Sequence, residues 1–533
     1  FAQGRGAWET AGRSWWAGWM MADYDVVERS IAELGADMAA GRVTAEALAA
    51  AYLARIDAVD RAGPTLRSVI AVSPRALDDA RAMDAERAAS RVRGPLHGVP
   101  VLVKDNIETA DGLATTAGSL ALQHNVTRRD APIVARLQAA GAVVIGKTNL
   151  SEWANIRSGA SISGWSAVGG LVKNPYALDR SAGGSSSGTG AAIAASLAAA
   201  GVGTETDGSI TCPASFAGLA GLKPTLGLVS RTHIVPISHS QDTAGPMGRS
   251  VADIAALLTA MAGSDPTDPA TAEADARRED YVAALAGASL AGKRLGVLGF
   301  AAKVTWAVDA VFAEALATLR AEGAEIVAVN DYEPPEDLGR NEFTVLLSDL
   351  KADLNAYLAT TPGSVKARTL ADLIAFNAAT PRETLLFGQD TFERADAMLG
   401  ADDPAYAKAR ADCLRATRAE GIDKLIGEHR LDALIAPSYA PAPRVDVVSG
   451  DFRIGRSPGR LAAIAGYPHL TVPMGQVRGL PVGLSFMGPA WSEATLLAMG
   501  HAFETAARVR RAPTYAASLE TGDEVAAAMS PVR

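Results

Sequence analysis

The chain has 533 residues, of which 48% are hydrophobic and 20% charged, and its formal net charge is −9. This length supports a large core, either as one large α/β unit or as two to three smaller domains. The acidic balance and the lack of Lys/Arg runs argue against partners such as nucleic acid or an anionic membrane surface, and favour a small neutral substrate.

The first twenty residues differ in character from the rest of the chain. They lack an initial Met and are rich in Gly and Trp, so we expect 1–20 to be an upstream extension and the natural start to be Met20 or Met21. The apolar stretch WWAGWMMA is short for a signal-peptide core and is followed at once by Asp23. We therefore expect a cytoplasmic protein, with periplasmic export through a truncated signal as the alternative.

The first half of the chain predicts helices and buried strands in turn. Residues 24–95 have a helical pattern, and VLVKD then reads as a short buried strand that carries Lys104 at its end. A helix is expected near 131–140, followed by the strand AVVIG. The alanine-rich segment AAIAASLAAAG predicts a helix that is closed by Gly201.

The second half predicts a helix over 249–262 and a β-α-β unit over 294–329 with Gly323 as the helix cap, which favours parallel pairing. Residues 340–425 read as helices. Within 262–425 this mostly helical segment is expected either to shape a substrate pocket or simply to pack. The strands DALIAPS, LTVPMG and PVGLSFMG and a last helix, SEATLLAMGHAFETAAR, end the pattern.

Two short motifs match known patterns in the wrong context. GAVVIGKT at 141–148 fits the phosphate-loop expression, but the apolar residues between its glycines favour a strand, so Lys147 is expected at a strand end. GSSSG at 184–188 fits the α/β-hydrolase elbow with Ser186 as nucleophile. That elbow needs a strand running into the serine, and the preceding NPYALDRSAG is broken by Pro175.

No metal site is indicated. Only Cys212 and Cys413 occur, which excludes a disulfide framework and a CxxC site. The seven histidines lack HExxH and HxH spacing, so we expect neither a metal nor another cofactor. No apolar run reaches the roughly 18 residues that a membrane span needs.

Three strings fit one pattern when they are taken together. They are VLVKDN around Lys104, SAGGSSSGTG with Ser185, and GTETDGSI with Ser209, and the two serines are 24 positions apart. With the flanking GKTNLSEWA, KNPY, GLAGLKPT, QDTAGPM and GLPVGLSFMG, the chain resembles the amidase signature family over most of 24–510, and its GTETDGSI form is similar to that of bacterial peptide amidase-type members. The resemblance implies a single large α/β/α domain over 21–525, with a mixed, largely parallel twisted central sheet covered by helices.

The resemblance also implies the roles of the site residues. Ser209 is the nucleophile, Ser185 relays its proton across a cis bond between Gly184 and Ser185, and Lys104 is the base. The oxyanion hole is expected from the backbone N–H groups of Thr206, Asp207, Gly208 and Ser209. Lys104 acts as a base only when neutral, which requires its pKa to fall by roughly three units, so the adjacent Asp105 must point away.

Supporting residues follow from their position in these strings. Ser186 either supports the relay by hydrogen bonds or caps the following helix, and Gly159 is expected near the substrate. Asp242 and Thr243 are expected to have structural roles. Glu205, Asp207 and Thr211 depart from the commoner GTDxGGSIR form of the nucleophile turn, which counts against a tRNA-dependent amidotransferase subunit.

The expected activity is hydrolysis of linear amides through an acyl-enzyme, with peptide C-terminal amides or aryl amides as substrates and with esters and carbamates as side activities. Two alternatives stay open. One is a partner-dependent subunit of the amidotransferase type, and the other is a Ser-His-Asp esterase that uses Ser186. The oligomeric state is not readable from the sequence.

Overall fold

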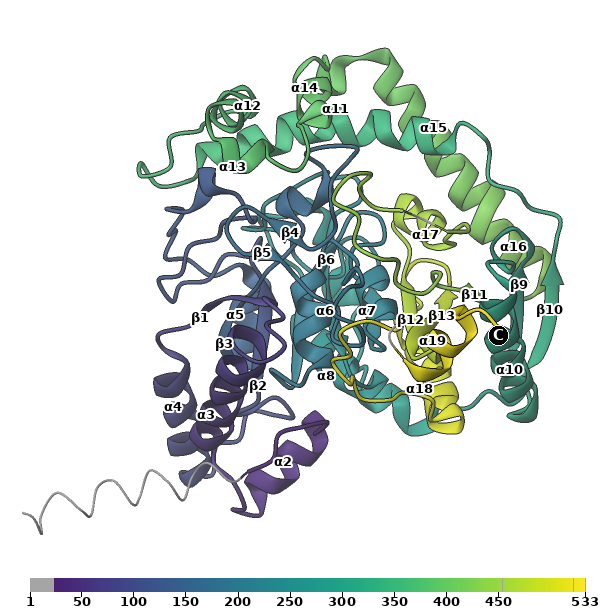
Figure 1. Cartoon of the computed structure of the whole chain (residues 1–533), viewed down its shortest axis with the longest axis horizontal. Coiled ribbons are helices and arrows are strands. Elements are labelled where there is room, and N and C mark those ends of the chain that lie inside the picture. Colours follow the sequence, from purple (N-terminus) through teal and green to yellow (C-terminus); the bar gives the residue numbers. More distant parts are fainter. Residues whose placement is uncertain (1–23, 453, 521, 533) are drawn as a thin grey trace, which may run out of the picture.

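An eleven-stranded sheet runs through the molecule (Figure 1), with the order β1-β3-β2-β6-β8-β7-β12-β13-β11-β9-β10. The computed structural model describes residues 24–532 apart from 453 and 521. The predicted extension over 1–20 lies outside the described residues. The strands of this sheet are β1 Val69–Val72, β2 Pro100–Lys104, β3 Val143–Thr148, β6 Ala200–Glu205, β7 Ala220–Lys223, β8 Thr243–Gly248, β9 Arg294–Leu298, β10 Glu325–Val329, β11 Ala433–Pro437, β12 His469–Val477 and β13 Leu480–Met487.

Strand pairing is parallel at the two flanks and antiparallel in the middle. Parallel pairs join β3 to β2, β2 to β6, β11 to β9 and β9 to β10. The pairs between β6 and β11 are antiparallel, as is β1 with β3. The mixed sheet in a single α/β domain is confirmed, but the expectation of a largely parallel sheet holds only at the flanks, because every pair from β6 to β11 is antiparallel, including the β12–β13 hairpin.

Helices cover the sheet. Strands β2, β3, β6, β7 and β8 are buried along their whole length, which explains their runs of apolar and small residues. The helices are α2 Ile31–Ala39, α3 Ala45–Arg55, α4 Ala76–Ala88, α5 Pro132–Ala139, α6 Ser187–Ala194, α7 Thr211–Phe216, α8 Val251–Met261, α9 Ala274–Arg277, α10 Trp306–Ala321, α11 Leu338–Ala359, α12 Leu370–Ala379, α13 Pro381–Thr384, α14 Asp390–Asp396, α15 Pro404–Thr417, α16 Asp423–His429, α17 Gly459–Ala465, α18 Glu493–Ala507 and α19 Asp523–Met529. A two-stranded sheet of β4 Trp165–Ser166 and β5 Gly170–Leu171 lies beside them.

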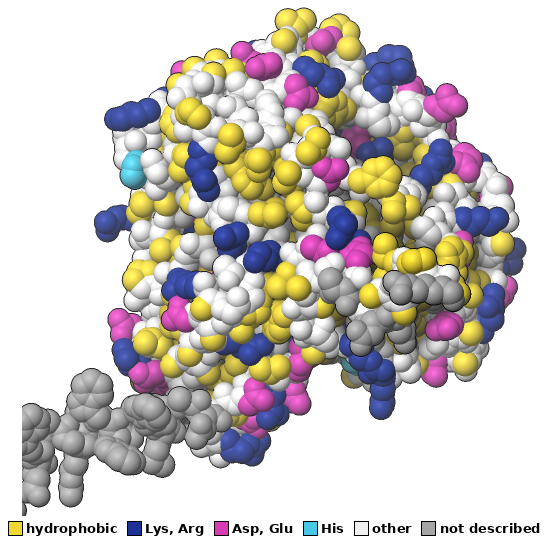
Figure 2. Space-filling model, viewed as in Figure 1, with side chains coloured by type: hydrophobic (Ala, Val, Ile, Leu, Met, Phe, Trp, Pro, Cys, Tyr) yellow, Lys and Arg dark blue, Asp and Glu magenta, His cyan; other side chains and the backbone are white. Residues whose placement is uncertain are grey.

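The predicted helical segment is confirmed. Helices α11 to α15 arch along one edge of the molecule, from α12 and α13 to α15 (Figure 1). The predicted β-α-β unit is also present as β9, α10 and the parallel β10, and Gly323 follows α10 with a positive φ of 89°. No helix among the described residues is long and apolar enough to cross a lipid bilayer. On the face drawn in Figure 2, acidic and basic side chains are interspersed.

Two predicted boundaries are wrong. The helix that begins at Ser187 ends at Ala194, and Gly201 lies inside β6. The helix ends before Ser196, whose φ is 55°, and after a short turn the chain enters β6 at Ala200, where burial between strands overrides the helix propensity of alanine. Residues 24–95 are also not wholly helical, since the β-branched segment at Val69–Val72 forms β1 against β3.

Candidate active site

The candidate catalytic residues come together because β2 and β6 are parallel neighbours. Lys104 is the last residue of β2, and the loop with Ser209 begins directly after β6 ends at Glu205. The carboxyl ends of parallel strands meet at the same edge of a sheet, so the lysine and the loop are adjacent. Ser185 reaches the same edge from the turn before α6. The predicted strand end at Lys104 is therefore confirmed.

Among the described residues, only neutral oxygens form hydrogen bonds with Lys104 Nζ. Its Nζ lies 2.8 Å from Ser185 Oγ, 2.8 Å from Thr204 Oγ1 and 3.3 Å from the Thr204 carbonyl oxygen. Asn106 Nδ2 also donates to Thr204 Oγ1, at 3.0 Å. A neutral amine has two N–H groups and one lone pair. When both N–H groups donate to Thr204, the lone pair is left facing the Ser185 hydroxyl.

Burial sets the charge state of this lysine. Lys104 is fully buried, and desolvation lowers its pKa from 10.5 to about 7, although the carboxylates of Asp242 and Glu205 act in the opposite direction. Asp105 points away, as expected: its carboxylate accepts from the Thr116 amide at 3.2 Å and lies 3.4 Å from Lys147 Nζ. A neutral amine near pH 7 is therefore compatible with this site.

The peptide bond between Gly184 and Ser185 is cis, as expected. A Cβ on Gly184 would lie 2.4 Å from Ser151 Oγ, so the chain requires glycine there. Ser209 joins this turn through its backbone, since its carbonyl accepts from the Ser186 amide at 3.1 Å. Although both residues are described, no hydrogen bond links the Ser185 and Ser209 hydroxyls in this arrangement.

Ser186 is the N-cap residue of α6, but its side chain makes no capping hydrogen bond and instead bonds the strand that lies beside Lys104. Its buried hydroxyl donates to the Thr204 carbonyl at 3.1 Å and accepts from the Thr204 amide at 3.2 Å. The residue therefore fixes the strand that carries Thr204. A loop precedes it in place of a strand, so the structure agrees with the rejection of a hydrolase elbow. Lys147 likewise lies within β3, as expected.

The turn after β6 is held by buried acidic groups. Asp242 accepts from Thr206 Oγ1 at 2.5 Å, and Glu205 accepts from the amides of Ile210 and Thr211 at 2.8 and 3.0 Å. Desolvation raises the pKa of Asp242 to about 6. Asp242 thus has a structural role, as expected: its carboxylate holds Thr206 at the start of this turn.

Gly208 is required by its surroundings. Its φ is +82°, and a Cβ there would lie 2.6 Å from the Tyr439 hydroxyl. The turn from Thr206 to Ser209 therefore lines the site with no side chain at position 208.

A cavity of about 710 Å³ opens in front of Ser209. The turn from Thr206 to Ser209 forms one wall, and aromatic and apolar side chains from distant segments form the others, among them Phe216, Phe300, Phe343, Leu346, Tyr439 and Phe452. Gly159 does not line this cavity: its amide donates to the carboxylate of Asp390 at 3.2 and 3.3 Å. A substrate contact by Gly159 stays a prediction.

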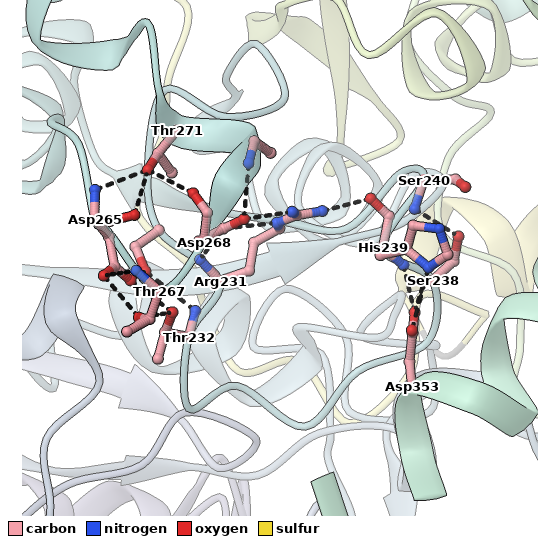
Figure 3. A network of polar contacts seen from close by, with 12 residues as sticks. Arg231, Thr232, Ser238, His239, Ser240, Asp265, Thr267, Asp268, Thr271 and Asp353 are labelled. Carbon is pink, nitrogen blue, oxygen red and sulfur yellow. Dashed lines mark hydrogen bonds and ion pairs between the residues drawn. The ribbon is translucent and has the colours of Figure 1, made fainter. Parts of the chain in front are cut away.

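The loop that leads to Gln241 and Asp242 is held by two sets of contacts, at Arg231 and at His239 (Figure 3). Arg231 donates to both carboxylate oxygens of Asp268, at 2.6 and 2.9 Å, and to the His239 carbonyl. The His239 amide donates to Asp353 of α11 at 2.6 Å, and the ring Nδ1 lies 3.0 Å from the same oxygen. The helical segment and the turn from Thr206 to Ser209 are thus connected through this loop.

Several site residues were missed by the sequence reasoning. Thr204 and Asn106 lie inside the matched strings, where their position beside the base was the available signal. Tyr439, Glu342 and Arg460 lie far from those strings in sequence, and no local pattern marks them.

Comparison with known proteins places this site in a family. The sequence model of the family described as Amidase matches residues 47–497, so the chain belongs to the amidase family and is an amidase. Within that family it is similar to peptide amidases: the crystal structure of the native peptide amidase from Stenotrophomonas maltophilia is 51% identical, with a TM-score of 0.87 over 92% of this chain and 99% of that one.

More distant relatives cover the chain equally well. A probable amidase of Arabidopsis thaliana is 38% identical over 507 residues, which are 93% of each protein. A glutamyl-tRNA(Gln) amidotransferase subunit of Rhodopirellula baltica is 34% identical over 519 residues, which are 92% of this chain and 99% of that protein.

Proposed function

We propose that this amidase hydrolyses linear amides, with peptide C-terminal amides as its main substrates, through a triad of Ser209, Ser185 and Lys104. The observation that carries the proposal is the 2.8 Å contact between Lys104 Nζ and Ser185 Oγ, made by a fully buried amine whose pKa is lowered to about 7. The substrate class rests on the similarity to peptide amidase. The cavity of about 710 Å³ accommodates a short peptide.

The reaction begins when the Ser209 hydroxyl attacks the carbonyl carbon. Its proton passes to Ser185 Oγ while the Ser185 proton passes to the lone pair of Lys104. The oxygen of the tetrahedral intermediate becomes negative and is bound by backbone N–H groups of the turn from Thr206 to Ser209. Loss of one such donor costs about 10²–10³ in rate.

Collapse of the intermediate breaks the C–N bond. The proton on Lys104 returns through Ser185 to the leaving nitrogen, and an acyl-enzyme remains on Ser209. Water then attacks that ester by the same relay and releases the acid. Esters and carbamates pass through the same tetrahedral geometry, so we expect them as side activities.

The test compares Ser209→Ala, Lys104→Ala and Ser186→Ala on a panel of peptide amides, p-nitroanilides, esters and carbamates. The first two variants should lose hydrolysis of every substrate, and Ser209→Ala should also lose covalent labelling by a fluorophosphonate. Activity that survives in Ser209→Ala contradicts the proposal. An esterase built on Ser186 predicts the reverse order, with Lys104→Ala active.

The similarity to amidotransferase subunits gives a second candidate, a catalytic subunit that needs a partner chain. It predicts that the purified chain alone turns over no simple amide. The higher identity to peptide amidase favours a chain that acts by itself.

A further inference from the structure

Two consecutive residues of the catalytic turn are each tied to the same carboxylate on α11. Gln241 Nε2 donates to the Thr206 carbonyl at 3.2 Å and to Glu342 Oε1 at 3.1 Å. Arg460 Nε lies 3.3 Å from Asp207 Oδ2 and 3.1 Å from Glu342 Oε2. These contacts form a closed ring of hydrogen bonds and ion pairs, which runs from Thr206 through Gln241, Glu342 and Arg460 to Asp207.

The ring acts on one peptide unit. The carbonyl of Thr206 and the N–H of Asp207 belong to the same planar peptide, so they point in opposite directions. A bond that fixes the carbonyl thus fixes the direction of the Asp207 N–H, a candidate oxyanion donor. The ion pair with Arg460 also restrains Asp207 through its side chain.

The central residues of this ring are buried. The Glu342 side chain is 4% exposed, and Gln241 is buried, whereas the Arg460 side chain is 44% exposed at the edge of the cavity. A hydrogen bond to a buried carboxylate is screened little by solvent and salt. Phe343 and Leu346 on the same helix line the cavity. An acyl group there would pack on the helix that holds the turn.

We propose that Glu342 is a positioning residue, which acts through Gln241 and Arg460 to aim the Asp207 N–H at the negative oxygen of the tetrahedral intermediate. This inference rests on the proposed function, since it concerns the oxyanion hole of that same reaction. Helix α11, although it is distant in sequence from the triad, would thus contribute to the rate acceleration through Glu342.

The test variant is Gln241→Leu, which removes the bond to the turn without touching the triad. The matched control is Gln389→Leu, because Gln389 is also a buried glutamine that donates to a backbone carbonyl, that of Ile374 at 3.1 Å, and bonds another side chain, Asn377. Thermal unfolding establishes that both variants are folded.

Gln241→Leu is expected to lower kcat on a peptide amide by about 10–100-fold with little change in KM, because an oxyanion donor is misdirected and not removed. The diagnostic readout is inhibitor affinity. A peptide aldehyde forms an oxyanion with Ser209 and should lose affinity by a similar factor, whereas the corresponding alcohol forms none and should bind unchanged. Gln389→Leu should match the wild type in every measurement.

Non-additivity tests the role of Glu342 itself. Glu342→Gln should lower kcat in the wild type, but should add no loss to a Gln241→Leu, Arg460→Met double variant, because both routes to the turn are then already broken. A folded Gln241→Leu with wild-type kcat, or equal affinity losses for aldehyde and alcohol, overturns the inference alone. A wild type that hydrolyses no amide overturns the proposed function as well.

Discussion

Lys104 is expected to support catalysis while it lowers the stability of the folded state. The variant Lys104→Met tests this, because it should lose activity but gain free energy of unfolding. The amine is fully buried and bound only to neutral oxygens of Ser185 and Thr204. Lowering its pKa from 10.5 to about 7 corresponds to ~5 kcal/mol, at about 1.36 kcal/mol per pH unit. This is the free energy that desolvation takes from the folded state at neutral pH.

The sign follows from proton binding. Between about pH 7 and 10.5 the unfolded lysine is protonated while the folded one is neutral, so the unfolded state binds more protons. The free energy of unfolding that is linked to this residue therefore rises with pH across that window and is constant below it.

Methionine keeps the length of the side chain without the amine. After the loss of the hydrogen bonds to Ser185 and Thr204, we expect Lys104→Met to raise the free energy of unfolding at pH 7 by ~1–3 kcal/mol while abolishing hydrolysis. Denaturant unfolding at pH 7 and pH 9.5 measures the difference, and the gain should shrink at the higher pH.

Lys147 is the matched control. It is also fully buried, but it lies 3.4 Å from the carboxylate of Asp105. Lys147→Met leaves that carboxylate buried without its partner, so the variant should lose about 3–5 kcal/mol. The reasoning is refuted if Lys104→Met is less stable than the wild type, or if its gain does not change with pH.

Three other outcomes are expected. In the wild type, kcat/KM should fall about tenfold per pH unit below pH 7, because Lys104 becomes protonated. Asp242→Asn should move this acidic limb of the pH profile to lower pH, because the Asp242 carboxylate raises the lysine pKa. A profile that is flat from pH 5 to 8 would exclude a titrating lysine. Gly208→Ala should lower kcat by about 10², because the new Cβ would clash with the Tyr439 hydroxyl and because a φ of +82° is unfavourable for alanine. Normal kcat in a folded variant would contradict this. Thr204→Val should lower kcat about tenfold or more by freeing the lysine N–H group that donates to the Thr204 hydroxyl. Single-turnover kinetics measures this, and an unchanged rate would show that the Thr204 hydroxyl does not orient the amine.

Local sequence determined most of the elements, and the family resemblance of its strings indicated the candidate triad. Alternating polar and apolar residues, turn residues and the strings around Lys104, Ser185 and Ser209 report on neighbours along the chain, and short-range interactions fix these features. The strand that ends at Lys104, the β9-α10-β10 unit and the helices after residue 338 were predicted for this reason. Family resemblance added the cis bond before Ser185.

Tertiary structure decided the rest. Alanine has high helix propensity, but the alanine run before Gly201 leaves the helix after Ala194, and Ala200 joins a strand that is buried between β2 and β8. The antiparallel centre of the sheet depends on which strands meet, which no single strand encodes. Arg460 and Glu342 lie more than a hundred positions from Ser209 and from each other, yet they bind one another at 3.1 Å. Contacts between side chains so far apart in sequence arise only when the sheet and α11 have packed, so no local pattern could reveal them.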